Sequence, residues 1–174
     1  MSFDMPLPDR SDPRWTNRGG IHVRRDDGIR RWLAGDTYVV KVTAADTNGS
    51  LGLIEATVPP GAGPVAHAHG SEDEAFYLLS GELEFLNGDE TLVAGPGDFV
   101  FIPRQNRHRF KNISEHPARM LVLFTPGGHE GNFVEIGDEP REGEQPPVWG
   151  PEHYAKALDN LVRYNVTLMP EDPQ

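Results

Sequence analysis

Two histidines separated by a single residue are the clearest chemical signal in this 174-residue sequence. His67 and His69 lie in the stretch from Gly61 to Gly81. Side chains on a β-strand alternate between faces with a period of two, so a strand would point both imidazoles the same way, about 7 Å apart along the backbone. A helix would splay them apart. We therefore expect two nitrogen ligands for a metal ion on one strand face.

A carboxylate and a third histidine complete the candidate site. Counting by two from Glu74 gives Phe76 and Leu78, so this carboxylate shares a face with an apolar stripe and should point inward. By the same rule, His108 shares a strand face with Phe110. We predict that His67, His69, Glu74 and His108 are the metal ligands.

Other acidic and histidine residues are weaker candidates. Glu72 would point to the same strand face as Glu74, because the two are separated by one residue. The sequence spacing from His69 favours Glu74 as the ligand. We therefore expect Glu72 in the turn, exposed together with Asp73. The remaining histidines are expected at the surface: His22, His116, His129 and His153. Among them, His129 follows the last predicted strand and could fold over the mouth of the barrel.

Composition excludes several classes of function. The chain is 37% hydrophobic and 25% charged, as in one ordinary soluble domain that can bury a core. The net charge is -11, from scattered acidic residues, which argues against nucleic acid or an anionic membrane surface as partner. There are no cysteines, which excludes disulfides, zinc ribbons and thiol nucleophiles.

The first 15 residues contain no apolar run of signal-peptide length, and no window approaches a membrane span. We therefore expect a cytoplasmic protein without membrane contacts.

Short β-branched or aromatic segments between glycine and proline turns predict an antiparallel sandwich or barrel. The expected strands are Ile29 to Leu33, Thr37 to Thr43, Leu51 to Val58, Ala75 to Leu86 with a bulge or corner at Gly81, Glu90 to Val93, Phe99 to Ile102, Arg107 to Lys111 and Ala118 to Phe124. The dipeptide Asn87-Gly88 predicts a hairpin.

The chain divides into four predicted parts. Residues 1–28 form an arm with a short strand at Ile21 to Arg24, and residues 29–126 form the barrel. Residues 127–150 are expected to be a loop or lid of little regular structure, apart from a short strand at Phe133 to Ile136. Residues 151–174 contain a helix with proline at its first position, followed by a tail. The apolar face of this helix should pack on the barrel or on a partner.

Two sets of residues resemble known motifs. The first cupin motif is matched by Gly61, His67, His69, Glu74 and Gly81, and the second by Gly97, Pro103, His108 and Asn112. The chain is thus similar to single-domain cupins from about Ile29 to Pro126. This resemblance implies an all-β fold, the antiparallel double-stranded β-helix or jelly roll. The family usually has glycine where Gln105 stands, and we expect Asn106 to supply the left-handed conformation instead.

Further segments resemble bacterial single-domain cupins of the flavonol dioxygenase (quercetinase) type. They are Glu72 to Phe85, Asp46 to Gly49 and Thr125 to Gly128. The resemblance implies that a substrate enol oxygen binds the metal, that a ligand glutamate takes the substrate hydroxyl proton, and that dioxygen then cleaves the ring. On this chain the catalytic glutamate would be Glu74.

Three imidazoles and a carboxylate suit one divalent transition metal, which could be iron, manganese, nickel, cobalt, copper or zinc, and they do not suit calcium. The preferred hypothesis is a metal-dependent dioxygenase acting on a small aromatic or enolisable substrate in the barrel. One alternative is a non-oxidative cyclase, isomerase or lyase of a natural-product pathway; another is a small-molecule-binding cupin without turnover. A purely structural metal or a metal-free site also stays open. The arm is long enough to support a homodimer, although the composition does not demand one.

Overall fold

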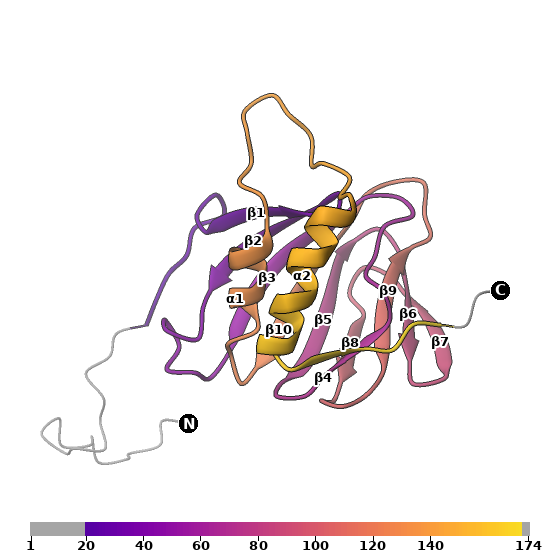
Figure 1. Ribbon diagram of the computed structural model, residues 1–174. Coiled ribbons are helices and arrows are strands. Elements are labelled where there is room, and N and C mark those ends of the chain that lie inside the picture. The colour runs from indigo at the N-terminus through magenta and orange to yellow at the C-terminus, as the bar shows by residue number, and fades with distance from the viewer. Residues whose placement is uncertain (1–19, 172–174) are drawn as a thin grey trace, which may run out of the picture.

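The computed structural model describes residues 20–171, which form two antiparallel sheets with two helices beside them (Figure 1). The predictions made for residues 1–19 lie outside the described residues. The larger sheet has the order β1-β2-β3-β10-β5-β8. Its strands are β1 (Ile29–Leu33), β2 (Asp36–Val42), β3 (Gly52–Val58), β10 (Ala118–Thr125), β5 (Asp73–Ser80) and β8 (Phe99–Ile102).

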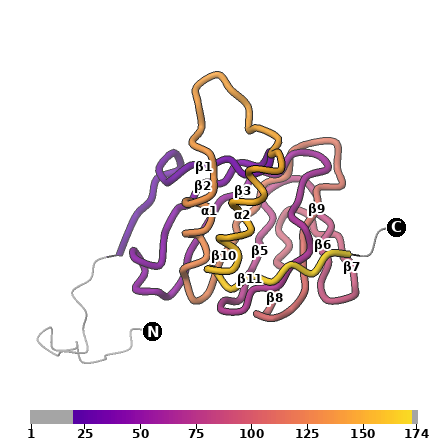
Figure 2. Tube along the Cα trace, in the orientation of Figure 1, coloured from indigo at the N-terminus to yellow at the C-terminus, as the bar shows by residue number. Residues whose placement is uncertain are grey.

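The smaller sheet has the order β11-β4-β9-β6-β7. Its strands are β11 (Val166–Leu168), β4 (His67–His69), β9 (His108–Asn112), β6 (Leu83–Asn87) and β7 (Glu90–Ala94). The helices are α1 (Glu130–Ile136) and α2 (Pro151–Arg163), which contact each other and lie side by side in both traces of the chain (Figures 1 and 2). No helix among residues 20–171 is long and apolar enough to cross a lipid bilayer.

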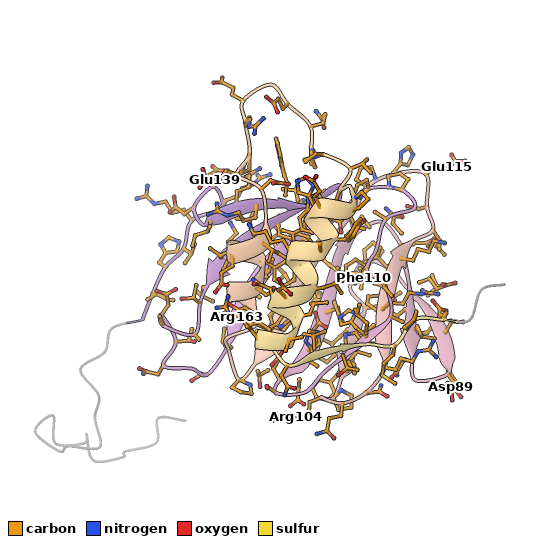
Figure 3. The ribbon with its side chains drawn as sticks, viewed as in Figure 1. Asp89, Arg104, Phe110, Glu115, Glu139 and Arg163 are labelled. Carbon is orange, nitrogen blue, oxygen red and sulfur yellow. The ribbon has the colours of Figure 1, made fainter. Side chains whose placement is uncertain are left out.

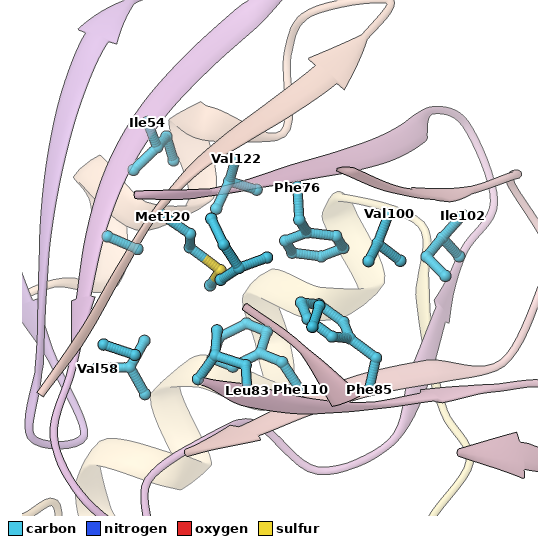
Figure 4. Packing of buried hydrophobic residues seen from close by; sticks show 14 of the residues in the cluster. Ile54, Val58, Phe76, Leu83, Phe85, Val100, Ile102, Phe110, Met120 and Val122 are labelled. Atoms are coloured by element: carbon cyan, nitrogen blue, oxygen red, sulfur yellow. The ribbon is translucent and has the colours of Figure 1, made fainter. Parts of the chain in front are cut away.

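The strands of the larger sheet follow the alternation that their sequences predict. Strands β2, β3 and β10 each place every second residue in the core, so the period of two sorts their side chains between the core and the other face. Aromatic rings from both sheets meet between them (Figure 4). The ring centroids of Phe76 and Phe85 are 5.0 Å apart, and those of Phe76 and Phe110 are 6.0 Å apart. Because Phe76 is also 6.5 Å from the His108 ring, this cluster supports one side of the candidate site.

The long strand predicted from Ala75 to Leu86 turns a corner at Gly81, which confirms the prediction of a bulge or corner. Gly81 has a φ of +75°, and a Cβ atom there would lie 2.7 Å from the Cα of Ala118. The corner sends β5 into one sheet and β6 into the other. A residue with a side chain would therefore clash where the two sheets join.

Two strand predictions are wrong. Ile21 to Arg24 has no strand and leads into a turn in which the Asp27 amide donates to the Arg24 carbonyl. Phe133 to Ile136 belongs to helix α1, so residues 127–150 hold more regular structure than predicted. The β-branched and aromatic composition of that segment favoured a strand, but tertiary packing outweighs this preference. In the helix, Phe133 packs against Tyr38 with ring centroids 4.7 Å apart.

The C-terminal segment contains the predicted helix and one strand that was not predicted. Strand β11 pairs antiparallel with β4, so that Val166 is opposite His69 and Leu168 is opposite His67. A three-residue strand is too short to show a periodic pattern, and only its partner identifies it. The segment therefore closes the edge of the strand that carries two of the predicted ligands.

The turn before His108 also differs from expectation. Gln105 itself adopts the left-handed conformation, with a φ of +66°, and Asn106 does not. The Gln105 amide donates to the His69 carbonyl at 2.6 Å. This hydrogen bond ties the turn to the histidine strand and accounts for a non-glycine residue in a conformation that glycine usually fills.

Candidate metal centre

The four side chains predicted as ligands converge in the barrel. The His108 Nε2 lies 2.7 Å and the His69 Nε2 lies 3.2 Å from the Glu74 Oε2. The His67 ring centroid is 4.5 Å from that of His108 and 5.0 Å from that of His69. One ligand atom from each of the four residues lies within 4.8 Å of the others. This spacing could hold a single metal ion.

The sheets bring these residues together from both sides of the barrel. His67 and His69 share the same face of β4, and His67 is directly opposite His108 across the β4–β9 pair. Glu74 comes from β5 in the other sheet, where it is in register with Phe124 and Ile102. The site is therefore built on strands, and the period of two that predicted it also positions it.

Backbone carbonyls orient two of the imidazoles. The His67 Nδ1 lies 2.8 Å from the Val65 carbonyl oxygen, and the His108 Nδ1 lies 2.9 Å from that of Asn106. A carbonyl only accepts, so Nδ1 carries the proton and donates in each ring. The Nε2 lone pair of each histidine is thereby left free for a metal ion, as is usual for metal-binding histidines.

A second carboxylate and a fourth imidazole complete the surroundings, and both were expected at the surface. Glu72 and His129 are each only 5% exposed. The Glu72 Oε1 lies 2.9 Å from the His69 Nδ1 and 2.9 Å from the His129 Nδ1. The prediction that Glu72 and His129 are surface residues is therefore wrong, and the site contains two buried carboxylates.

The loop after β10 explains the burial of His129. The Gly127 amide donates to the Gly49 carbonyl at 3.0 Å, and a Cβ atom on Gly127 would lie 2.6 Å from the carbonyl carbon of Leu51. The chain therefore packs against the start of β3 and turns back toward the barrel. Gly127-Gly128 directly before the histidine was the available signal, but a glycine pair alone does not indicate which way a loop turns.

The predictions for the other histidines are confirmed, whereas Asp73, which was expected to be exposed in the turn, begins β5 and is half-buried. His22, His116 and His153 are exposed. Asp73 points away from the site and pairs with Arg104, with the Arg104 Nη2 3.0 Å from the Asp73 Oδ2. Arg104 lies at the edge of the molecule, far from the barrel interior that contains Phe110 (Figure 3).

Charge sharing governs the protonation of the site. Burial by itself would raise the pKa of Glu74, but the imidazoles of His69 and His108 lower it well below its usual value. Burial would lower the pKa of His69, whereas the carboxylates of Glu74 and Glu72 raise it to about 9. The two carboxylates thus favour the protonated, positively charged form of His69. A divalent cation would take the place of this proton.

The remaining groups are shifted in the direction that suits metal binding. Burial, together with the neighbouring imidazoles of His108 and His69, lowers the pKa of His67 to about 3. Burial also lowers the pKa of His129. The pKa of Glu72 falls to about 2, because the imidazoles of His129 and His69 outweigh the effect of burial. Neutral imidazoles and ionised carboxylates are the forms that bind metal ions.

Several of the polar atoms fit a cation better than they fit one another. Within residues 20–171, neither nitrogen of His69 has a well-aligned hydrogen-bond partner, and the same holds for the Glu72 Oε1 and the His129 Nδ1. These ring nitrogens lie close to carboxylate oxygens, but their N–H bonds do not point at those oxygens. Buried groups without aligned partners are costly, and a cation held by the four predicted ligands would stabilise the His69 Nε2. The other three atoms belong to the neighbouring group of His69, Glu72 and His129. The residues present therefore fit a metal ion.

A cavity of about 340 Å³ opens beside the candidate metal centre. Its walls are mostly apolar and include Phe76 and Phe110, which were predicted to share faces with the ligands. Helix α2 contributes Tyr154, Leu158 and Leu161 to the lining. The volume and the mixture of apolar walls with a few polar groups are typical of a small-molecule site.

Comparison with known proteins agrees with this architecture. Residues 54–124 match the family model described as Cupin domain. The structure of KdgF from Halomonas sp. superposes with a TM-score of 0.58 at 18% identity, covering 65% of this chain and 99% of that one. Residues 54–124 are thus similar to a cupin domain, and the two sheets with a histidine and glutamate cluster between them agree with that similarity. The fold of the chain is the cupin double-stranded β-helix.

Curated relatives share part of their length with this chain. Quercetin 2,3-dioxygenase from Bacillus subtilis (strain 168) is 30% identical over 115 residues, which are 65% of this chain and 33% of that protein. Polyketide synthase CurC from Streptomyces cyaneus is 33% identical over 90 residues, 52% of this chain and 57% of that protein. The chain thus covers less than two thirds of each of these relatives.

Proposed function

We propose that this protein is a metal-dependent dioxygenase that acts on a small aromatic or enolisable substrate inside the barrel. His67, His69, Glu74 and His108 would hold one divalent transition metal. The observation that carries the proposal is the convergence of these four side chains beside a largely apolar cavity of about 340 Å³. The similarity to the Bacillus quercetin 2,3-dioxygenase supports it.

The bound metal would supply Lewis acidity toward a substrate hydroxyl, and any of the candidates other than zinc would also supply a redox-active centre for dioxygen. Glu74 would act as the base that takes the proton of the substrate hydroxyl onto a carboxylate oxygen. The pKa of Glu74 is low because His69 and His108 stabilise its ionised form, so it is ready to accept at neutral pH but is a weak base. It can take the proton only from a hydroxyl group whose own pKa has been lowered.

The other residues would orient and enclose the reactants. The carbonyls of Val65 and Asn106 hold the rings of His67 and His108, and the Glu72 carboxylate lies 2.9 Å from the Nδ1 of His69. The apolar walls would hold the aromatic part of a substrate and displace water from it. With water displaced, the dielectric constant of the site is low. Interactions of the substrate with the metal ion and with the Glu74 carboxylate would then be stronger than in water.

Oxygen consumption by the metal-loaded protein tests this proposal. We expect uptake with a panel of flavonols and other enolisable phenols, and a loss of about 100-fold or more in Glu74→Gln, since the base is removed. Glu55→Gln is the matched control, because Glu55 is on β3 and pairs with Arg119. Equal oxygen uptake by Glu74→Gln and the wild type would contradict the role of Glu74.

A non-oxidative reaction is the second candidate, and the similarity to polyketide synthase CurC favours it. A cyclase, isomerase or lyase would use the same ligands and the same base without dioxygen. Turnover of a substrate under strict anaerobiosis would establish this alternative and exclude the dioxygenase. Tight ligand binding without turnover in either atmosphere would indicate a binding protein.

A further inference from the structure

A buried carboxylate lies in the same cavity but on a different strand from the candidate metal ligands. Asp36 begins β2 and is only 5% exposed. The Tyr38 hydroxyl donates to the Asp36 Oδ2 at 2.8 Å. The other oxygen, Oδ1, has no hydrogen-bond partner within the described residues, although both Asp36 and Tyr38 line the cavity. An unpaired buried carboxylate oxygen is costly unless a ligand donates to it.

Helix α1 brings a second unpaired acceptor to the same cavity. Asn132 is 5% exposed, and its Oδ1 has no partner among residues 20–171. Asn132 also lines the cavity. Two residues that line the cavity, one on β2 and one on α1, therefore each hold a buried acceptor oxygen without a hydrogen-bond donor among the described residues. We call Asp36, Tyr38 and Asn132 the polar recess.

The polar recess lies on other elements than the candidate metal ligands but within reach of their charge, because burial, Asp36 and Glu74 all raise the pKa of Tyr38. In the larger sheet β2 lies three strand spacings from β5, which carries Glu74, and each spacing is about 4.8 Å. The wall of the cavity also includes Val122 and Phe133. A ligand in this cavity therefore meets polar groups at the metal centre and at the recess, with apolar walls elsewhere.

We propose that the polar recess recognises a hydroxyl group on the end of an aromatic ligand that points away from the metal centre. The substrate class is then a hydroxylated aromatic molecule with a metal-binding enol or phenol at its other end. This inference rests on the proposed function, because it assumes that one end of the ligand lies at the metal centre.

The chemistry of the recess favours a hydroxyl group over an anion. Two acceptor oxygens would repel a ligand carboxylate or phosphate, whereas a hydroxyl can donate to either of them. Burial raises the pKa of Asp36 to about 7, against the effect of the Tyr38 hydrogen bond, so both protonation states are accessible near neutrality. A hydroxyl fits both states because it can donate to the carboxylate and accept from the carboxylic acid.

A purely structural role leaves one observation unexplained. Asp36 could serve only to accept the hydrogen bond of the buried Tyr38, but that contact uses Oδ2 alone. The orphaned Oδ1 and the orphaned oxygen of Asn132 would both stay costly in the ligand-free protein. A ligand hydroxyl, or water molecules that the ligand displaces, would satisfy them.

Binding of two flavonols that differ in their hydroxyl groups tests the inference. Quercetin and 3-hydroxyflavone share the enol and carbonyl that would face the metal, but only quercetin carries further hydroxyls on its rings. The dissociation constants of both are measured by titration of the metal-loaded protein without oxygen. We expect the wild type to prefer quercetin, and Asp36→Ala to reduce this preference about 10-fold or more.

Two further variants keep the test interpretable. Asn132→Ala should also reduce the preference for quercetin. It replaces Asp36→Ala as the test if that variant does not fold, because alanine is well tolerated in a helix. Leu158→Ala is the matched control, since Leu158 lines the cavity from α2 but has no polar atom in its side chain. It should weaken both flavonols alike and leave the ratio of their dissociation constants unchanged.

The ratio of the two dissociation constants decides the outcome. A ratio that is unchanged in both Asp36→Ala and Asn132→Ala overturns the polar recess as a recognition site. This result is independent of catalysis: oxygen uptake with an unchanged ratio would contradict only the recess. Conversely, a ratio that responds to Asp36 in a protein without oxygen uptake would support the recess and contradict the dioxygenase.

Discussion

The carboxylate of Glu72 lies between the imidazoles of His69 and His129, so its effect on a metal ion would pass through His69. One Glu72 oxygen is 2.9 Å from the Nδ1 of each ring. A carboxylate in this place fixes the ring orientation of a metal-binding histidine and raises its basicity. Glu72 is therefore a positioning residue of the proposed centre.

We predict that Glu72→Gln lowers the affinity for a divalent transition metal about 10- to 100-fold while the fold is kept. The measurement is metal titration of the demetallated protein, with circular dichroism as the check on folding. Glu55→Gln again serves as control, because Glu55 pairs with Arg119 rather than with a ligand. A metal affinity within twofold of the wild type would contradict the role of Glu72 as a positioning residue.

Asp36 should make stability depend on pH in an unusual direction for a carboxylate. Burial raises its pKa from 3.8 to about 7, so the folded protein binds this proton more tightly than the unfolded chain. The resulting stabilisation is complete below the unfolded pKa and is lost as the pH rises through about 7.

Asp36→Asn should abolish this dependence. Between about pH 5 and pH 8 the wild type should lose about 2–3 kcal/mol of unfolding free energy relative to the variant. Urea unfolding of both proteins at the two pH values measures the difference, and the other titrating groups cancel because the two proteins share them. Parallel pH profiles would show that Asp36 is ionised normally in the folded state.

Regular strands were the part of the structure that could be predicted from the sequence. A period of two places His67 and His69 on one face and points Glu74 inward, and the structure brings these residues together with His108. Glu72 and His129 could not be predicted in the site, because turns and loops have no period and their direction depends on tertiary contacts. The same limit hid β11, which is recognised only by its pairing with β4.

The polar recess could not be predicted for a related reason. Asp36 begins its strand at a turn, and Asn132 belongs to a helix that occupies part of a segment expected to be irregular or extended. Their meeting in one cavity depends on how α1 packs against the larger sheet. Sequence spacing carries no information about that contact.

The turn at Gln105 is the element whose local strain can be relieved by one substitution. We predict that Gln105→Gly stabilises the protein by about 0.5–1 kcal/mol, since the left-handed conformation costs a non-glycine residue more than the unfolded glycine loses in entropy. Thermal unfolding should show a midpoint higher by about 2–4 °C.

Gln105→Ala provides the control for this turn. The Gln105 side chain is exposed, so its removal alone should change stability little. Because alanine keeps the strained conformation, it should not reproduce the gain that we expect for glycine. A lower midpoint for Gln105→Gly would show that the hydrogen bond from residue 105 to the His69 carbonyl depends on more than the backbone conformation.

At the scale of the whole molecule, the C-terminal segment leaves α2 and runs beside β4 (Figure 1). Helix α2 lines the cavity with Leu158 and Leu161, and β11 pairs with the strand of His67 and His69. Part of the apolar face of α2 thus packs on the barrel, but Val162 stays 80% exposed and Leu158 50% exposed, so contact of this face with a partner stays a prediction as well. The homodimer, the cytoplasmic location and the division into arm, barrel, lid and tail stay predictions.

Metal content tests the central claim most directly. After loading with excess divalent transition metal and removal of the unbound ion, elemental analysis should find about one metal per chain in the wild type. His108→Ala should lose most of it, because one ligand and the partner of Glu74 are removed together. A wild type that binds no metal, or a His108→Ala variant that keeps a full equivalent, would contradict the proposed ligand set of His67, His69, Glu74 and His108.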